Sequence, residues 1–206
     1  MTARQRKSQS RAAIGLRVKS GRAIAVVLQG AAESPEVILR EELLLASPGK
    51  PKTWQPFHAV MDLPWKEAQE ATKEVAREAR AAAARGLREL QKQLRDSGID
   101  LQGAGIVGGS LLDPAQIGNP HIRAHAAEGR FFRQAAERGA GACGLLTRTF
   151  AQKSLYETAA PEIGFSVKAL KLRVTALGAK RIKPWRADEK EAALAAWALL
   201  AGRGRR

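Results

Sequence analysis

Residues 12–28, AAIGLRVKSGRAIAVVL, contain two aliphatic, β-rich runs on either side of a single pair of turn residues. The runs cover 12–19 and 22–28, and the pair between them is Ser20-Gly21. Because glycine adopts a positive φ at little cost, this pair suits a tight hairpin. We therefore predict that the fold opens with two antiparallel strands.

A third strand is predicted over residues 36–45 (EVILREELLL), which a Ser-Pro-Gly turn ends. The stretch 46–64 follows with four prolines and is too proline-rich for a regular element. It contains Trp54, Phe57 and His58. Long loops of this kind are often functional, but aromatic residues that anchor the loop to the core explain the same composition. We favour the anchored loop.

The remainder of the chain alternates helices and strands. Apolar residues recur at three- and four-residue spacing over 65–95, which predicts one long helix. Asn119-Pro120 matches the cap and first turn of a second helix, and Asp188 with Glu191 has capping-box spacing at the start of the last one. After the long helix we expect a strand over 103–109, a helix over 120–138, a strand over 145–150, and helices over 166–177 and 188–200.

This order of elements resembles the ribonuclease H-like superfamily. The opening Ile14-Gly15-Leu16-Arg17 before a hairpin, and the closing alanine-rich helix DEKEAALAAWALL (188–200), are similar to its Holliday-junction resolvase (RuvC) branch. The resemblance implies an α/β fold with a mixed sheet flanked by helices: three antiparallel strands, then alternating helices and strands. It covers 12–201, which we predict to form one domain. Residues 1–11 lack an apolar anchor and are predicted to be a disordered basic tail, and 202–206 a second basic tail.

Nucleases of that family hold two divalent metals with carboxylates from the first strand, the fourth strand and the last helix. Here the first-strand position aligns with Arg17, and the fourth-strand position falls near Val107 and Gly108. The acids of the last helix would fall near Glu189 and Ala192. The resemblance therefore implies an inactive member. Mg²⁺ or Mn²⁺ is expected only if a nuclease activity exists, and no other cofactor is expected.

Positive charge is concentrated in a few segments of this chain, whose net charge is +15. The segments 1–22, 168–186 and 203–206 contain no acid and hold 17 of the 35 Lys and Arg residues. Such a distribution is typical of a protein that binds a polyanion, although a charge run that only aids solubility is the alternative. The candidate nucleic-acid-binding residues are Arg17, Lys19, Arg22, Lys168, Lys171, Arg173, Lys180, Arg181, Lys183, Trp185 and Arg186.

Trp185 has two possible roles among these cations. Single-stranded nucleic acid is bound where cations pair with phosphates beside a ring that stacks on a base. A core tryptophan with solvated neighbours explains the same residues, and we favour this role slightly because a tryptophan just before an amphipathic helix commonly anchors it.

His121, His125 and Glu128 fall on one face of the helix predicted over 120–138. Two imidazoles and a carboxylate could bind a divalent metal or form an acid–base pair. A polar helix face, with Glu128 paired to Arg133 or to a neighbouring segment, is the interpretation we favour. For a hydrolase, the candidate catalytic residues would be His125, Glu128 and Glu189.

We therefore predict a non-catalytic ribonuclease H-like domain that binds nucleic acid, either DNA or RNA. A metal-dependent nuclease or hydrolase and a scaffold for an acidic protein are the alternatives. The single cysteine, Cys143, rules out an internal disulfide and fits a reducing cytosol. The longest apolar run, Ala192 to Ala201, is shorter than the roughly 20 residues that span a bilayer. We expect a cytoplasmic protein without a membrane partner.

Overall fold

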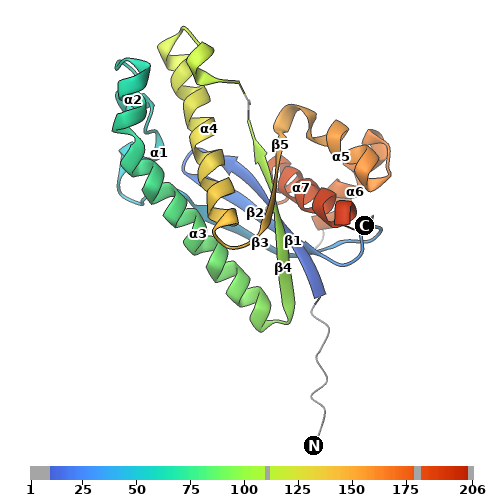
Figure 1. Ribbon diagram of the computed structural model, residues 1–206. Helices are drawn as coiled ribbons and strands as arrows, with labels where there is room; N and C mark the ends of the chain where they lie inside the picture. The colour runs from blue at the N-terminus through green and yellow to red at the C-terminus, as the bar shows by residue number, and fades with distance from the viewer. Residues whose placement is uncertain (1–9, 110–111, 179–181, 204–206) are drawn as a thin grey trace, which may run out of the picture.

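A computed structural model describes residues 10–109, 112–178 and 182–203. A five-stranded sheet with helices on both faces forms its centre (Figure 1). The strand order is β3-β2-β1-β4-β5; β2 is antiparallel to β1 and β3, while β4 is parallel to β1 and β5. The predicted α/β fold with a mixed sheet is confirmed. The strands are β1 (Ser10–Lys19), β2 (Arg22–Gln29), β3 (Glu36–Leu44), β4 (Ile99–Gly108) and β5 (Leu146–Ala151).

The opening hairpin forms as the sequence predicts. Gly21 has a φ of 72°, in the left-handed region that glycine tolerates. Its carbonyl accepts hydrogen bonds from the backbone N–H groups of Leu45 and Ala46, at 2.8 and 3.0 Å. These bonds tie the end of the third strand to the turn between the first two.

The helices differ from the predicted ones in three places. The single helix predicted over 65–95 is interrupted at Thr72, whose hydroxyl donates to the Ala68 carbonyl. The proline-rich stretch 46–64 includes a short helix and a 3₁₀ turn, and α5 was not predicted because Pro161 lies within it. The helices are α1 (Pro51–Trp54), α2 (Trp65–Ala71), α3 (Lys73–Asp96), α4 (Pro120–Gly141), α5 (Leu155–Ile163), α6 (Val167–Gly178) and α7 (Ala187–Arg203), with 3₁₀ turns η1 (His58–Val60), η2 (Pro114–Gln116) and η3 (Gln152–Ser154).

Both ends of the domain extend further than predicted. Ser10 and Arg11 belong to β1, because they pair with Ile99 and Asp100 at the start of β4. The last helix continues to Arg203, beyond the boundary predicted at residue 201. The remaining residues of the two predicted tails lie outside the described part of the chain.

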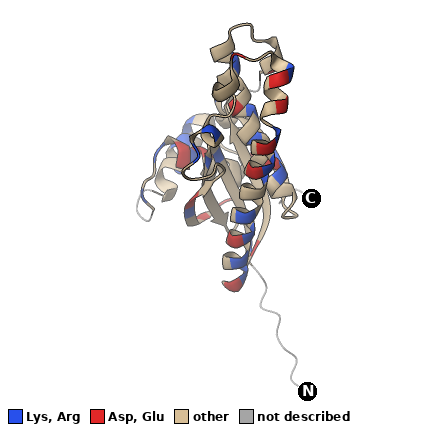
Figure 2. Cartoon of the chain, turned by 90° about the vertical axis from the view of Figure 1, so that its left-hand side faces the viewer, with Lys and Arg blue, Asp and Glu red and all other residues tan. Residues whose placement is uncertain are grey.

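The sheet separates two layers of helices. α3 and α4 pack on one face, against side chains that include Ile14 and Leu16 of β1 (Figure 1). α5, α6 and α7 pack on the other face, where Ala13 and Val107 of the sheet meet the buried Trp197 of α7. In the cartoon of Figure 2, the positions of basic and acidic residues are interspersed along α3. We call these two groups of helices the α3–α4 layer and the α7 layer.

The α7 helix lies unusually close to the sheet because both surfaces carry small residues. A Cβ placed on Gly15 of β1 would lie 1.7 Å from the Ala192 carbonyl oxygen, and one on Gly105 of β4 would lie 2.6 Å from that of Ala195. The glycines of residues 103–108 therefore serve backbone packing within β4. This close approach brings the first turns of α7 to the carboxyl end of β1.

Candidate functional site

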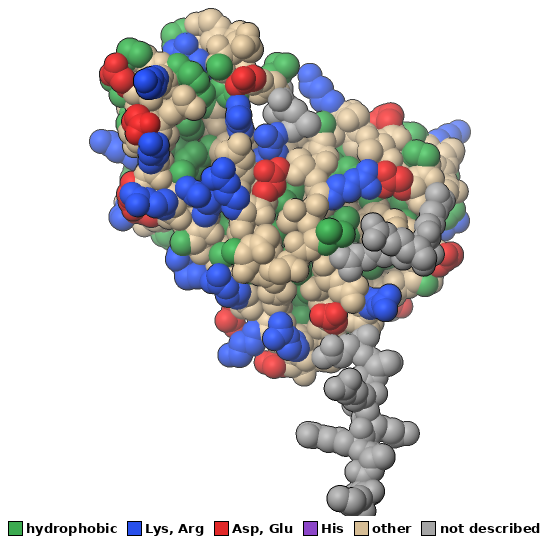
Figure 3. Space-filling view, viewed as in Figure 1, with side chains coloured by type: hydrophobic (Ala, Val, Ile, Leu, Met, Phe, Trp, Pro, Cys, Tyr) green, Lys and Arg blue, Asp and Glu red, His purple; other side chains and the backbone are tan. Residues whose placement is uncertain are grey.

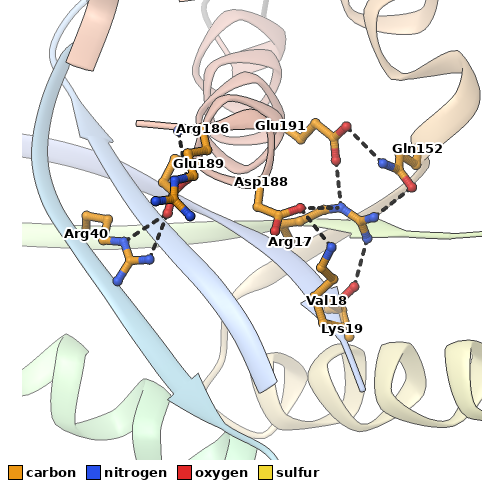
Figure 4. A network of polar contacts seen from close by, with 9 residues as sticks. All are labelled: Arg17, Val18, Lys19, Arg40, Gln152, Arg186, Asp188, Glu189 and Glu191. Atoms are coloured by element: carbon orange, nitrogen blue, oxygen red, sulfur yellow. Dashed lines mark hydrogen bonds and ion pairs between the residues drawn. The ribbon is translucent and has the colours of Figure 1, made fainter. Parts of the chain in front are cut away.

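Arg17 lies where the carboxyl ends of β1 and β4 meet η3 and the start of α7. It is the third residue from the end of β1, is paired in register with Val107 of the parallel strand β4, and is 5% exposed. It faces α7 and the η3 turn that follows β5 (Figure 4). A buried guanidinium needs charged or hydrogen-bonding partners, since leaving it unpaired would cost several kcal/mol.

Two carboxylates of α7 and one amide supply those partners (Figure 4). Arg17 Nε lies 2.6 Å from Glu191 Oε2 and 3.7 Å from Asp188 Oδ1. Its terminal nitrogens donate to Gln152 Oε1 at 2.7 Å and to the Val18 carbonyl at 2.8 Å. Gln152 also donates to Glu191 at 3.0 Å, and Lys19 Nζ lies 3.1 Å from Asp188. We call this set the Arg17 network.

Glu189 belongs to a second buried pair beside the network. Its Oε1 accepts hydrogen bonds from Arg40 of β3 at 3.2 and 2.7 Å, and its Oε2 accepts the backbone N–H of Arg186 at 2.9 Å. Burial alone would raise the pKa of this carboxyl. The hydrogen bonds and the positive charge of Arg40 more than offset burial, so the pKa of Glu189 lies below its usual value.

The register of α7 differs by one residue from the predicted one. The alignment gave Glu189 and Ala192 as the positions facing the first strand, but Asp188 and Glu191 face Arg17. The predicted capping box is also shifted, because α7 begins at Ala187 and Glu189 is the acid that reaches back to the backbone of Arg186. Asp188 contacts Lys19 and Arg17 instead.

The residues of the Arg17 network do not fit the two divalent metals that the family resemblance implies. The cations of Arg17 and Lys19 already pair with Asp188 and Glu191, and they would repel divalent cations placed among the same carboxylates. Val107, beside Arg17 in the sheet, has no group that could bind a metal. No catalytic step through such metals is derived for this chain.

The candidate nucleic-acid-binding residues differ in how far they are exposed and in whether they pair with acids. Arg17 is wrongly assigned to this role, because it is buried and paired inside the protein. Lys19 is partly exposed and Arg22 is exposed, but they pair with Asp188 and Glu42. The other exposed candidates are Lys168, Lys171 and Arg173 of α6 and Lys183 and Arg186 of the connector to α7. Lys180 and Arg181 lie outside the described residues.

Trp185 packs on α6, and its side chain is only partly exposed to solvent. Its indole N–H donates to the Val174 carbonyl at 3.0 Å. A Cβ placed on Gly178 would lie 2.3 Å from the ring, which shows how closely the ring covers this glycine. The contacts favour the anchoring role over stacking on a base.

The second group of candidates, His121, His125 and Glu128, lies on α4 in the other layer. Glu128 is 1% exposed and pairs with His58 of η1, not with Arg133, which lies 3.5 Å from Glu137. His58 is therefore a residue of this group that the sequence analysis left in an anchored loop. The sequence held one clue to His58: the chain has three histidines, and His58 is the one that does not share the helix face of the other two.

Cys143, the single cysteine, lies beside α3. Its thiol lies 3.5 Å from the Ala84 carbonyl oxygen and is partly buried. Burial raises the pKa of the Cys143 thiol, and the charge of Arg88 lowers it less. A raised thiol pKa reduces the thiolate fraction that a nucleophile needs.

Comparison with known proteins gives one kind of similarity, that of the fold. No protein-family model and no curated protein matches the sequence. Two solved structures of RuvC from Thermus thermophilus share the fold at a TM-score of 0.55 each; one is in complex with a Holliday junction substrate. Their sequence identities are 12% and 11%, and each comparison covers 94% of this chain and 96% of RuvC. The chain therefore has the ribonuclease H-like fold of RuvC. Within the described residues, no helix is long and apolar enough to cross a membrane.

Proposed function

We propose that this protein binds nucleic acid and does not cleave it by the two-metal chemistry of ribonuclease H-like nucleases. The observation that carries this proposal is the position of Arg17. Its guanidinium lies at the carboxyl end of β1, among the carboxylates that a divalent metal would need. A buried cation in this place supplies charge balance to the fold and leaves no set of free acids.

Binding is supported by the exposed cations of α6 and the connector. Lys168, Lys171 and Arg173 project from one helix, and Lys183 and Arg186 follow in the connector to α7. Lysine and arginine contact phosphates without regard to base sequence. On the face seen in Figure 3, Lys and Arg are interspersed with Asp and Glu. The junction complex of RuvC adds support, because it shows this fold on branched DNA.

Binding is tested by titrating labelled single-stranded DNA, duplex DNA, RNA and a four-way junction at two salt concentrations. Affinity should fall steeply with salt, because each neutralised phosphate releases roughly 0.7 to 0.9 counterion. Lys183→Ala should reduce the salt slope by about one. Lys66→Ala is the matched control. Lys66 is an exposed lysine of α2, which contacts α3, and its removal should leave the salt slope unchanged. If the protein binds none of these ligands at low salt, the proposal is contradicted and an acidic protein is favoured as the partner.

Cleavage is tested with the same substrates in Mg²⁺ and in Mn²⁺. Wild type should leave all of them intact. Arg17→Asp should not create activity, because Val107 still supplies no ligand. Reproducible metal-dependent cleavage by wild type that is lost in Glu189→Gln or Glu128→Gln would show that the protein is a nuclease.

A further inference from the structure

The three histidines of the chain meet at one point on the α3–α4 layer. His58 lies at the start of η1, and its ring centroid is 4.4 Å from that of His125 and 5.2 Å from that of His121. The centroids of His121 and His125 are 4.6 Å apart, one turn from each other on α4. Residues that are distant in sequence thus place three imidazoles edge to face.

The three rings offer ligand atoms that are close enough to share one cation. One ring nitrogen from each histidine lies within 4.8 Å of the other two. A tetrahedral zinc ion with Zn–N distances of about 2.0–2.1 Å requires ligand nitrogens about 3.3 Å apart. His121 and His125 are exposed, so their rings can turn by the small amount that separates these two distances.

Glu128 fixes the third ring in the orientation that a metal requires. Its Oε1 accepts hydrogen bonds from the backbone N–H of His58 at 3.2 Å and from Nδ1 of the same residue at 2.8 Å. When Glu128 is ionised it only accepts hydrogen bonds, so Nδ1 of a neutral His58 would carry the proton and Nε2 would keep its lone pair. Histidine ligands of metals typically donate their other N–H to a carboxylate in this way.

Packing does not account for the histidine cluster. The neighbouring Phe57 already anchors the loop, since it is 8% exposed and its ring stacks on Trp65 and meets the edge of Phe131. The exposed imidazoles of His121 and His125 bury little apolar surface where they meet His58. A cation shared by the three rings would account for their convergence.

We propose that His58, His121 and His125 bind one divalent late transition metal ion of the zinc class, with Glu128 as a positioning residue. Imidazole nitrogens suit Zn²⁺, Co²⁺, Ni²⁺ and Cu²⁺, whereas Mg²⁺ and Ca²⁺ prefer oxygen ligands. Three protein ligands leave a fourth position for water or an anion, as in catalytic zinc sites. The site shares no residue with the Arg17 network, so it does not depend on the proposed function.

The test uses the full chain without a histidine tag, after treatment with a chelator. Isothermal titration with ZnCl₂ should show one equivalent bound, and MgCl₂ should show none. Addition of CoCl₂ should give the strong visible absorption of four-coordinate Co²⁺, which reports the ligand geometry directly. Absence of zinc binding would overturn the proposal.

Variants assign the binding to these residues. His121→Asn and His125→Asn should each weaken zinc binding more than Glu128→Gln does, and Glu128→Gln should weaken it about 10- to 100-fold. Ile122→Asn is the matched control, because Ile122 is exposed on the same turn of α4 but is not a ligand, and it should bind zinc as wild type does. Circular dichroism should show each variant folded. Zinc binding that persists when all three histidines are asparagine would overturn the proposal even if wild type binds one equivalent.

Discussion

The Arg17 network and the histidine cluster of α4 and η1 differ in how far their polar side chains are buried. On the α7 side of the sheet, Arg17 of β1 is 5% exposed and is surrounded by carboxylates and carbonyl oxygens of the protein itself. In the α3–α4 layer, His121 and His125 are exposed, and only Glu128 beneath them is buried. A buried charge must find its partners within the fold, whereas an exposed lone pair can take a partner from solution. The first arrangement stabilises the protein, and the second can bind a ligand.

The largest effect is expected from Arg17→Met, which keeps most of the side-chain volume and removes the charge. Asp188 and Glu191 would then face each other without the guanidinium between them. Removal of one partner of a buried ion pair costs about 3–5 kcal/mol, and urea unfolding should show a loss of this size. Addition of Glu191→Gln should recover part of it, because the two residues are coupled. A loss below about 1 kcal/mol, the value typical of surface pairs, would mean that the network is not closed to solvent.

Trp185→Ala tests whether the connector belongs to the α7 layer. The ring covers Gly178 and bonds the Val174 carbonyl. Because it is only partly buried, we expect a loss of about 3 kcal/mol, the lower end for such substitutions. Thermal unfolding measures it. An unchanged melting temperature together with a loss of about 1–3 kcal/mol in single-strand affinity would instead place the ring on a base.

Glu189→Gln should lower the free energy of unfolding by less than the two substitutions above, because the amide oxygen still accepts some of the hydrogen bonds. We expect about 1–3 kcal/mol at neutral pH. The pKa of Glu189 is lower in the folded protein than its usual value of 4.5, so its contribution is full above that value and is lost as the pH falls through the folded pKa. Urea unfolding at several pH values should therefore show the difference between wild type and variant narrowing below pH 4.5. A constant difference across this range would mean that the charge of Glu189 does not stabilise the fold.

The smallest effect on stability is expected from His121→Asn in the α3–α4 layer. The side chain is exposed, and such substitutions usually change stability by less than about 0.5 kcal/mol. The same variant should lose the rise in melting temperature that Zn²⁺ gives wild type, because only a metal bound to the folded state raises it. A large destabilisation without zinc would show that the cluster is part of the core, as the Arg17 network is.

Local patterns in the sequence were sufficient for the opening hairpin and for one face of α4, whereas the strand predicted over 103–109 begins earlier, at Ile99. The turn Ser20-Gly21 between two aliphatic runs predicts the hairpin, since turn geometry and alternation are properties of neighbouring residues. Asn119 caps α4 through its side chain, as predicted. The spacing of His121, His125 and Glu128 likewise follows from 3.6 residues per turn. Each of these inferences needs only residues that are close together in the sequence.

The partners across the fold were decided by tertiary structure alone. His58 reaches Glu128 because the loop 46–64 is anchored beside α4 through Phe57, and no local pattern relates these positions. Arg17 meets Asp188 and Glu191 because small residues let α7 lie on the sheet with one particular rotation. A shift of one residue turns a helix by about 100° and would present another set of acids. The sequence determines which side chains share a face of an element, and the packing of the elements determines which faces meet.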